Sequence, residues 1–244
     1  SNSSVVTSTR RNADGSKTTT TTQPDGTKVA ITTDAAGKMA VDVTLPATVV
    51  ANAQQKNEAV ALPMATVSVS QDVADAPVIT VRTGSEEPVK VAIPVSPVGM
   101  GTVAMLMNDD GTMEVIASSA LTETAVVLSL SDGAQVKIVD NTKAFTDVPA
   151  EAWFANAATF VSARNLFDEM NEGVFALEGS MTYAMLTTAL SRLDGVKPED
   201  NAAWLEQAAA WSGALAGGAM VDPNGSFSGE ELVGMIWAYA GSPV

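Results

Sequence analysis

The side chains that could carry acid–base chemistry in this chain are carboxylates, because the sequence contains no histidine and no cysteine. Without imidazole or thiol groups there is no Ser-His-Asp triad, no thiolate nucleophile and no zinc site of the usual ligands. Adjacent carboxylates occur at Glu86-Glu87, Asp168-Glu169 and Glu199-Asp200. Glycosidases place their two carboxylates on separate elements that face one sugar, whereas sequence neighbours usually point apart. These pairs are interpreted as solvated charges, and the chain is predicted to be no enzyme and to need no cofactor or metal.

One acidic motif superficially resembles part of a calcium loop, Asp109-Asp110-Gly111. It lacks the alternating Asp or Asn ligands and the closing Glu that such a loop requires. The motif is therefore predicted to be the turn of a hairpin that joins strands near Val103–Met107 and Glu114–Ile116.

The net charge of −15 restricts the partners. Residues 145–244 carry 3 basic and 13 acidic side chains, so most of the excess lies in that part. Nucleic acids and anionic membrane surfaces attract Lys and Arg, and we expect neither as a partner. No apolar run approaches the roughly 18 residues of a bilayer-spanning helix, so membrane insertion is not expected either. The Ser1–Ser4 start carries no signal-peptide pattern and is interpreted as a mature or trimmed end.

Turn signals recur every 11 residues near the start of the chain, at Asp14-Gly15, Asp25-Gly26 and Ala36-Gly37. Thr- and Val-rich runs lie between them, and Gly accepts the positive φ of a tight hairpin turn. Residues 1–45 are predicted to form a β-meander of three or four strands. Its first strands have little apolar surface, so we expect packing on a neighbouring domain or partial disorder.

Residues 46–143 are predicted to form a β-sandwich of Ig-like type, because short alternating runs are separated by regular turns. Ala65–Ser70 and Val89–Ile93 alternate as half-buried strands do. A second hairpin is predicted for Val126–Leu130 and Val136–Val139, with its turn at Asp132-Gly133.

The period changes from strand to helix after about residue 143, and one pattern then occurs twice. The first copy runs from Phe145-Thr146-Asp147-Val148 through Trp153 and a helical stretch to Leu166, then through Gly173-Val174-Phe175 and Gly179–Thr182 into a helix from Ala184 to Leu193. The second copy places Trp204, Gly225-Ser226 and Glu230–Tyr239 in the same order. Such self-similarity predicts two helix–loop–helix repeats, over 144–196 and 197–244, that pack against each other.

This pattern resembles the S-layer homology repeat, the module that holds exported bacterial proteins to a cell-wall polysaccharide without a covalent bond. The resemblance rests on the Phe-x-Asp-Val opening, the Trp six residues later, the Gly-x-Phe and the loop before the last helix. It covers about 100 of the 244 residues. The fold class expected for the whole chain is therefore multidomain, β followed by an all-α pair of repeats.

The resemblance implies ligand-binding roles for Asp147, Trp153 and Tyr183. In the family, this Asp and an Arg at the entry of the last helix line the polysaccharide groove. Asp147 is alternatively an N-cap or turn residue, and Trp153 is expected to pack in the core. Tyr183 and Gly229 stand where the family has the two arginines, and a phenol can stack on a sugar but cannot replace a bidentate cation.

The function expected from this reasoning is that of a non-enzymatic protein at the surface of a Gram-positive-type cell, extracellular and associated with the wall. Its partner is cell-wall polysaccharide, bound weakly or no longer bound, or another surface protein. Two alternatives stay open: a protein-binding adhesin module that uses the β-sandwich, and an acidic carbohydrate-active enzyme. Opposed carboxylates in a cleft favour the enzyme, and an exposed apolar patch or an open edge strand favours the adhesin.

Overall fold

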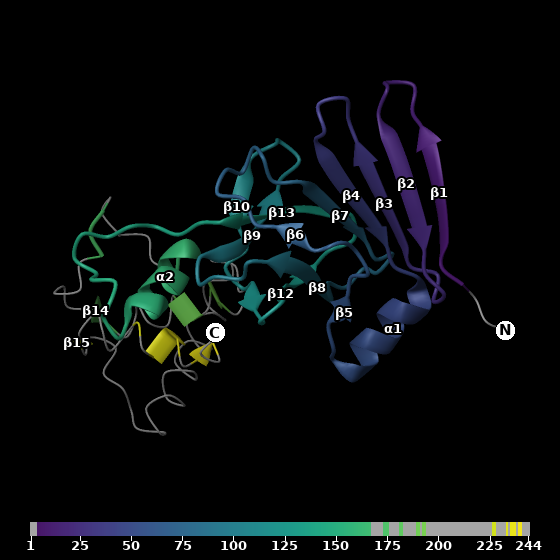
Figure 1. The fold of residues 1–244 in the computed structure, drawn as a ribbon. Helices are drawn as coiled ribbons and strands as arrows, with labels where there is room; N and C mark the ends of the chain where they lie inside the picture. Colours follow the sequence, from purple (N-terminus) through teal and green to yellow (C-terminus); the bar gives the residue numbers. More distant parts are fainter. Residues whose placement is uncertain are drawn as a thin grey trace. The chain divides into compact units, whose positions relative to one another are not determined.

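The computed structural model describes residues 4–166 and, beyond them, 173–175, 181–182, 189–190, 192–193, 226–227, 233, 235–237 and 239–240 (Figure 1). The chain divides into two compact units. The first unit comprises Ser1–Val98, Ala104–Val115 and Leu121–Asp140, and the second comprises Gly99–Val103, Ile116–Ala120 and Asn141–Val244. The prediction of a β-rich region is confirmed. No described helix is long and apolar enough to cross a membrane.

An eight-stranded mixed sheet dominates the β region. Its strands, in spatial order, are β1 (Val6–Arg11), β2 (Lys17–Thr22), β3 (Lys28–Thr33), β4 (Met39–Thr44), β7 (Val78–Arg82), β13 (Ala134–Asp140), β9 (Thr102–Met107) and β10 (Met113–Val115). The predicted meander is confirmed as β1–β4, which pair antiparallel in sequence order. Because β4 continues into a parallel pair with β7, the meander extends the larger sheet and does not stand alone.

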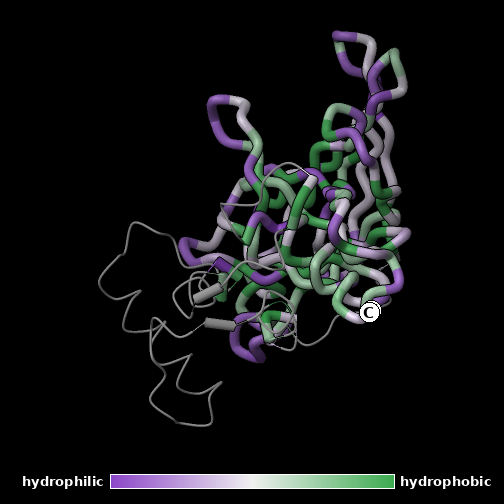
Figure 2. Tube along the Cα trace, turned by 90° about the vertical axis from the view of Figure 1, so that its left-hand side faces the viewer, coloured by the Kyte–Doolittle hydropathy of each residue, from purple (hydrophilic) through white to green (hydrophobic). Residues whose placement is uncertain are grey.

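The turns of the meander share one geometry, which the Asp-Gly signal predicted. In the β1–β2 hairpin, Gly15 has φ +85° and donates its N–H to the Asn12 carbonyl, while Asn12 donates to Ser16. The Asp14 carboxylate accepts the N–H of Ser16 at 2.9 Å. This is a type I turn closed by a left-handed residue, the common three-residue hairpin loop. The same pattern recurs in the β2–β3, β3–β4 and β9–β10 hairpins, so the predicted Asp109-Asp110-Gly111 turn is confirmed. Figure 2 shows hydrophilic stretches at the projecting hairpin tips, together with some hydrophobic residues.

A smaller sheet contains β11 (Ala120–Leu121), β12 (Ala125–Leu130), β8 (Val89–Ser96) and β5 (Val60–Ala61), in that order, with β6 (Val67–Ser68) also beside β8. Burial alternates along β8 and β12, so one face of this sheet lies in the core. In the larger sheet Val41, Val43, Ile79 and Val81 are buried as well. Two sheets with buried side chains between them are typical of a sandwich, and the central strands β7 and β13 of the larger sheet have buried residues on both faces. The parallel pairs β4–β7, β5–β8 and β6–β8 differ from the antiparallel sheets of an Ig-like sandwich.

The predicted hairpin between Val126–Leu130 and Val136–Val139 is wrong. β12 pairs with β8 in the smaller sheet, whereas β13 pairs with β7 in the larger one. Asp132-Gly133 is therefore a crossover between the two sheets. The Asp132 carboxylate accepts the backbone N–H groups of Thr83 and Gly84 at 2.8 and 3.0 Å. These two hydrogen bonds fix the crossover and lower the pKa of Asp132.

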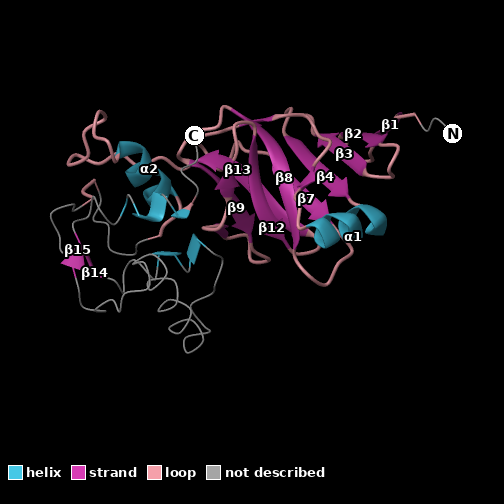
Figure 3. Ribbon diagram, turned by 90° about the horizontal axis from the view of Figure 1, so that it is seen from below, coloured by secondary structure: helices cyan, strands magenta, loops and turns pink. Residues whose placement is uncertain are grey.

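Helix α1 (Ala47–Lys56) lies within the region predicted to be all β. Pro46 precedes it with φ −65°, a value already suited to a helix start. Asn57 ends it in the left-handed conformation, where its N–H and that of Glu58 bond the last carbonyls. Val50 and Ala53 are the buried side chains of α1, which contacts β8 and β5 (Figure 3).

In the second unit, helix α2 (Ala155–Ala163) lies within the helical stretch predicted to follow Trp153. The described residues of the two other predicted helices, Ala189, Leu190, Arg192 and Leu193 in one and Val233, Met235–Trp237 and Tyr239 in the other, are also helical. Buried side chains from all three segments form one apolar core, which contains Phe154, Val161, Phe175, Leu190, Val233 and Ile236 among others. Residues of both predicted repeats therefore contribute to the same core.

A short antiparallel pair joins the two copies of the pattern. Strand β14 (Met181–Thr182) pairs with β15 (Ser226–Phe227), and Met181 lies opposite Phe227. These two residues follow the Gly-Ser that the copies share, so equivalent positions of the two copies face each other. This contact is a strand pair within a region for which the repeats predicted only helices and loops.

Candidate functional site

The opening loop of the first repeat is held by hydrogen bonds to the Gly173-Val174-Phe175 segment. The Asp147 carboxylate accepts the N–H of Phe175 at 2.8 Å, and both the N–H and the hydroxyl of Thr146 donate to the Gly173 carbonyl. The rings of Phe145 and Phe175 meet edge to face with centroids 5.2 Å apart. Two landmarks of the repeat that are far apart in sequence thus form one structural unit.

Asp147 does not cap helix α2, so the N-cap alternative is wrong. The N-cap position is Phe154, and no side chain accepts a hydrogen bond from the first helical turn there. Asp147 instead accepts a backbone N–H from a distant loop, which agrees with the turn alternative. A carboxylate that accepts a backbone N–H is held in one orientation. The ligand-binding role of Asp147 stays a prediction.

Trp153 is exposed, and its predicted place in the core is wrong. Its relative exposure is 70%, whereas the neighbouring Phe154 is only 5% exposed. The two rings lie edge to face, with centroids 5.7 Å apart and an angle of 87° between planes. The chain thus buries one aromatic ring at the start of α2 and presents the next to solvent. An exposed indole supported by a buried ring offers an apolar surface with one N–H donor.

Tyr183, the third predicted site residue, lies outside the described residues, as do Gly229, Glu230 and Glu231. Of the residues assigned to polysaccharide binding, the structure therefore describes Asp147 and Trp153. They flank the same short opening segment, one tied to the Phe175 loop and the other exposed.

A fully buried cation, Arg164, was not singled out from the sequence. Its guanidinium donates to the carbonyls of Ser119, Thr102, Met100 and Phe160 at 3.0–3.4 Å, and its carbon atom Cζ lies 3.8 Å from the centre of the Phe160 ring. Burial lowers the pKa of Arg164 to about 9, so the group still carries its charge at neutral pH. These partners are structural, and at 1% exposure the cation is inaccessible to an anionic ligand. The available sequence signal was an Arg at the end of an apolar helix.

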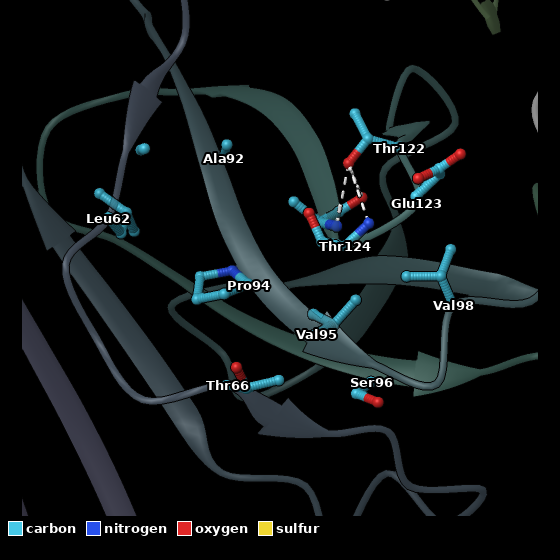
Figure 4. Close-up of a pocket in the computed structure, with 12 residues that line it drawn as sticks. Leu62, Thr66, Ala92, Pro94, Val95, Ser96, Val98, Thr122, Glu123 and Thr124 are labelled. Carbon is cyan, nitrogen blue, oxygen red and sulfur yellow. Dashed lines mark hydrogen bonds between the residues drawn. The ribbon is translucent and has the colours of Figure 1, made fainter.

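The first unit contains a cleft of about 490 Å³ over β8. Small side chains, Ala61, Ala92, Pro94 and Ser96, form much of its lining (Figure 4). Leu62 and Thr66 lie on one side of β8, and the loop with Thr122, Glu123 and Thr124 lies on the other.

Hydrogen bonds shape the loop that borders this cleft. The Thr122 hydroxyl accepts the N–H groups of Thr124 and Ala125, at 3.3 and 3.0 Å, and Val95 donates its N–H to the Thr124 carbonyl. Glu123 is the one ionisable side chain in the cleft lining. The cleft can therefore accept a small apolar or cationic group, but its lining does not supply the two carboxylates of a glycosidase.

A second hollow, of about 400 Å³, lies where the end of α1 meets the start of β8. Its lining includes Glu58, Glu87 and Lys90. Of these two hollows in the described residues, this one has two carboxylates in its lining, Glu58 and Glu87. In the part of the chain that the structure describes, no group of three metal-binding side chains is present.

Comparison with known proteins adds no family assignment: no family model, curated protein or solved structure matches the chain.

Proposed function

We propose that this protein is a secreted, non-enzymatic component of a Gram-positive-type cell surface whose helical unit descends from a wall-anchoring S-layer homology module. The first repeat contacts cell-wall polysaccharide weakly, through Trp153 and the loop that Asp147 holds. The observation that carries this proposal is the exposure of Trp153, because its sequence position corresponds to the Trp beside the family's ligand groove. A planar aromatic surface matches the apolar face of a sugar ring.

The relation between the two copies supports the same proposal. Their Gly-Ser loops pair as β14 and β15 with equivalent residues opposed, and their helical residues share a core. Duplicated segments related by an approximate twofold axis make such contacts between equivalent positions. Such contacts support the proposal that the two copies arose from one duplicated segment.

Charge explains why we propose weak binding. Wall polymers of the family are typically anionic, and residues 145–244 carry 13 acidic and 3 basic side chains. One of those three, Arg164, is buried against peptide carbonyls and cannot meet a polymer. Salt screens the long-range repulsion but does not supply a bidentate cation in place of the residues at Tyr183 and Gly229.

The test is co-sedimentation of the full chain with native wall sacculi at physiological salt. Trp153→Ala is expected to lower the affinity about tenfold, equivalent to about 1.4 kcal/mol. Met39→Ala, at an exposed apolar residue of the first unit, is the control and is expected to bind as the unaltered chain does. The double variant Tyr183→Arg, Gly229→Arg is expected to bind more tightly. Unchanged binding by Trp153→Ala would remove the basis of the proposal.

A second candidate, a protein-binding adhesin module, is favoured by the cleft over β8. A cleft with a floor of small residues and one carboxylate suits a cationic side chain of a partner protein. Ala92→Leu fills this cleft without touching Trp153. If the chain binds intact cells through the cleft, Ala92→Leu abolishes that binding and Trp153→Ala leaves it unchanged; the wall-anchor proposal expects the reverse.

A further inference from the structure

Strand β1 forms one edge of the larger sheet, and all six of its residues are exposed. It pairs with β2, and no other described strand pairs with it. The strand at the opposite edge, β10, has three residues. A long, straight, exposed edge is a template for a further strand, whereas a very short edge is a protected one. β1 is therefore the edge at which this sheet can grow.

The hydrogen bonds of the first hairpin determine which residues face the open side. Asn12 donates its N–H to Ser16 and so belongs to a hydrogen-bonded pair across the hairpin. Hydrogen-bonded and non-hydrogen-bonded pairs alternate along an antiparallel ladder. Val6, Ser8 and Arg10 consequently direct their peptide groups toward β2. Thr7 and Thr9 direct theirs, with those of Val5 and Arg11, toward the open side.

This alternation restricts how a second copy of β1 can add in antiparallel orientation. To form hydrogen bonds, Thr7 must lie opposite a residue whose peptide groups also point to the open side. The longest symmetric overlap that meets this condition places Thr7 opposite Thr9 of the other copy. Ser8 then lies opposite Ser8 in a non-hydrogen-bonded pair on the twofold axis. A twofold axis between two equivalent strands is a common geometry of a symmetric dimer.

The side chains of β1 suit this register. Thr7 and Thr9 already lie beside Thr21 and Thr19 of β2, with hydroxyl oxygens 3.5 and 3.3 Å apart, so the added strand continues a row of threonines. Cross-strand Thr pairs contribute favourably in sheets. Val5 and Val6, which are 53% and 59% exposed, come opposite Arg11 and Arg10 of the other copy.

Charge favours the antiparallel orientation over the parallel one. In the antiparallel register, each valine is covered by the aliphatic part of an arginine, and the two pairs of arginines lie at opposite ends of the interface. A parallel pair in register would place Arg10 opposite Arg10 and Arg11 opposite Arg11, which like-charge repulsion disfavours.

We propose that the protein self-associates through antiparallel pairing of β1 with β1 of a second copy, centred on Ser8. The pairing satisfies the open peptide groups of Val5, Thr7, Thr9 and Arg11 in both copies. It produces one sheet that continues through two molecules, and it does not depend on wall binding.

Engineered cysteines test the register directly, because the chain contains none of its own. Opposed residues in a non-hydrogen-bonded pair have Cα atoms about 4.5 Å apart, within the range that a disulfide bridges. Ser8→Cys is expected to form a disulfide-linked dimer under mild oxidation. Arg10→Cys, on the same strand and the same face, is the control. In the proposed register the two Arg10 positions lie about 14 Å apart along the strands, so this variant is expected to form no disulfide-linked dimer. The double variant Val6→Cys, Arg10→Cys is expected to cross-link.

A second variant tests the hydrogen bonds without introducing a thiol. Thr9→Pro removes an N–H that faces the open side, so it leaves the β1–β2 ladder intact. Analytical ultracentrifugation of the full chain is expected to show a dimer whose dissociation constant rises about tenfold or more in this variant, since each copy loses one bond. A chain that is monomeric at all concentrations, or Ser8→Cys that cross-links no more than Arg10→Cys, would overturn the proposal.

Discussion

Arg164 illustrates how a buried charge can be satisfied without a carboxylate. Its described hydrogen bonds all go to peptide carbonyls, and its guanidinium plane lies over the Phe160 ring. Carbonyl oxygens partly replace water around the cation, and the ring face adds a favourable electrostatic contact. The four carbonyls come from α2 and from the segments around residues 101 and 119. Arg164 therefore holds α2 to two segments that are distant in the sequence.

We predict that Arg164→Met destabilises the second unit by on the order of 3–5 kcal/mol, because it leaves several buried carbonyls without donors. All four tryptophans, Trp153, Trp204, Trp211 and Trp237, belong to this unit, so indole fluorescence during urea unfolding reports on it alone. Arg164→Lys keeps the charge with fewer donors and is expected to lose less stability. Equal midpoints for the unaltered chain and Arg164→Met would contradict this role.

The elements that sequence reasoning predicted well are those whose signal is local. The Asp-Gly turns of the meander have two local requirements. One residue must adopt a positive φ, and a carboxylate must accept the backbone N–H of the residue two positions later. Both requirements can be read within five residues of sequence. The Asp132-Gly133 turn carries the same local signal but joins two different sheets. Which strand β13 pairs with depends on β7, which lies more than 50 residues earlier, and no local pattern contains that information.

Two other errors have similar causes. Helix α1 was missed because its β-branched Thr48, Val49 and Val50 favour strands by propensity. Packing of Val50 and Ala53 outweighs that preference. For the candidate site, the sequence placed Asp147 and Trp153 on one opening segment. It did not predict that Phe154, and not Trp153, fills the core, because two adjacent aromatic residues at a helix start give no indication of which is buried.

The glycines of the meander turns allow a matched comparison. Gly37 has φ +83° and no atom within 4 Å of the site of an added Cβ, so Gly37→Ala is expected to cost about 1–2 kcal/mol of backbone strain. Gly26 has φ +93°, and an added Cβ would lie 3.2 Å from Cγ of Pro46. Gly26→Ala is therefore predicted to lower the thermal midpoint, followed by circular dichroism, further than Gly37→Ala does. The opposite order would show that Pro46 moves aside at no cost.

Asp132 gives the sheet crossover a defined pH dependence. The N–H groups of Gly84 and Thr83 lower its pKa in the folded state below the ordinary value of 3.8. A carboxyl with a lowered folded pKa stabilises the fold above its unfolded pKa, and this contribution is lost as pH falls through the folded pKa. We predict that the unaltered chain loses more stability between about pH 5 and pH 2 than Asp132→Asn does, as measured by urea unfolding followed by circular dichroism. Parallel pH profiles would exclude this contribution.

At the scale of the whole molecule, the two units do not follow the order of the sequence. The change from strand to helical periodicity was placed near residue 143, and the second unit also includes Gly99–Val103 and Ile116–Ala120. Asn141 links the first of these segments to α2, because its N–H donates to the Gly101 carbonyl at 2.8 Å and its side-chain amide donates to the Ala163 carbonyl of α2 at 2.6 Å. Helical periodicity indicates where a helix begins. It does not indicate which earlier segments supply the carbonyls that accept hydrogen bonds from Arg164.

It follows that the helical repeats should not fold as an isolated C-terminal piece. A fragment of residues 141–244 lacks Met100, Thr102 and Ser119, whose carbonyls accept from Arg164, and Ala117, which packs on the apolar core. Burying the Arg164 cation without these acceptors carries a desolvation cost of several kcal/mol, comparable with the whole stability of a small domain. We predict that the fragment shows the red-shifted tryptophan emission of an unfolded chain and no cooperative urea transition. A fragment of residues 99–244 restores both segments and is expected to regain part of the native emission. A cooperative transition with native-like emission in the 141–244 fragment would show that the repeats supply their own partners for Arg164.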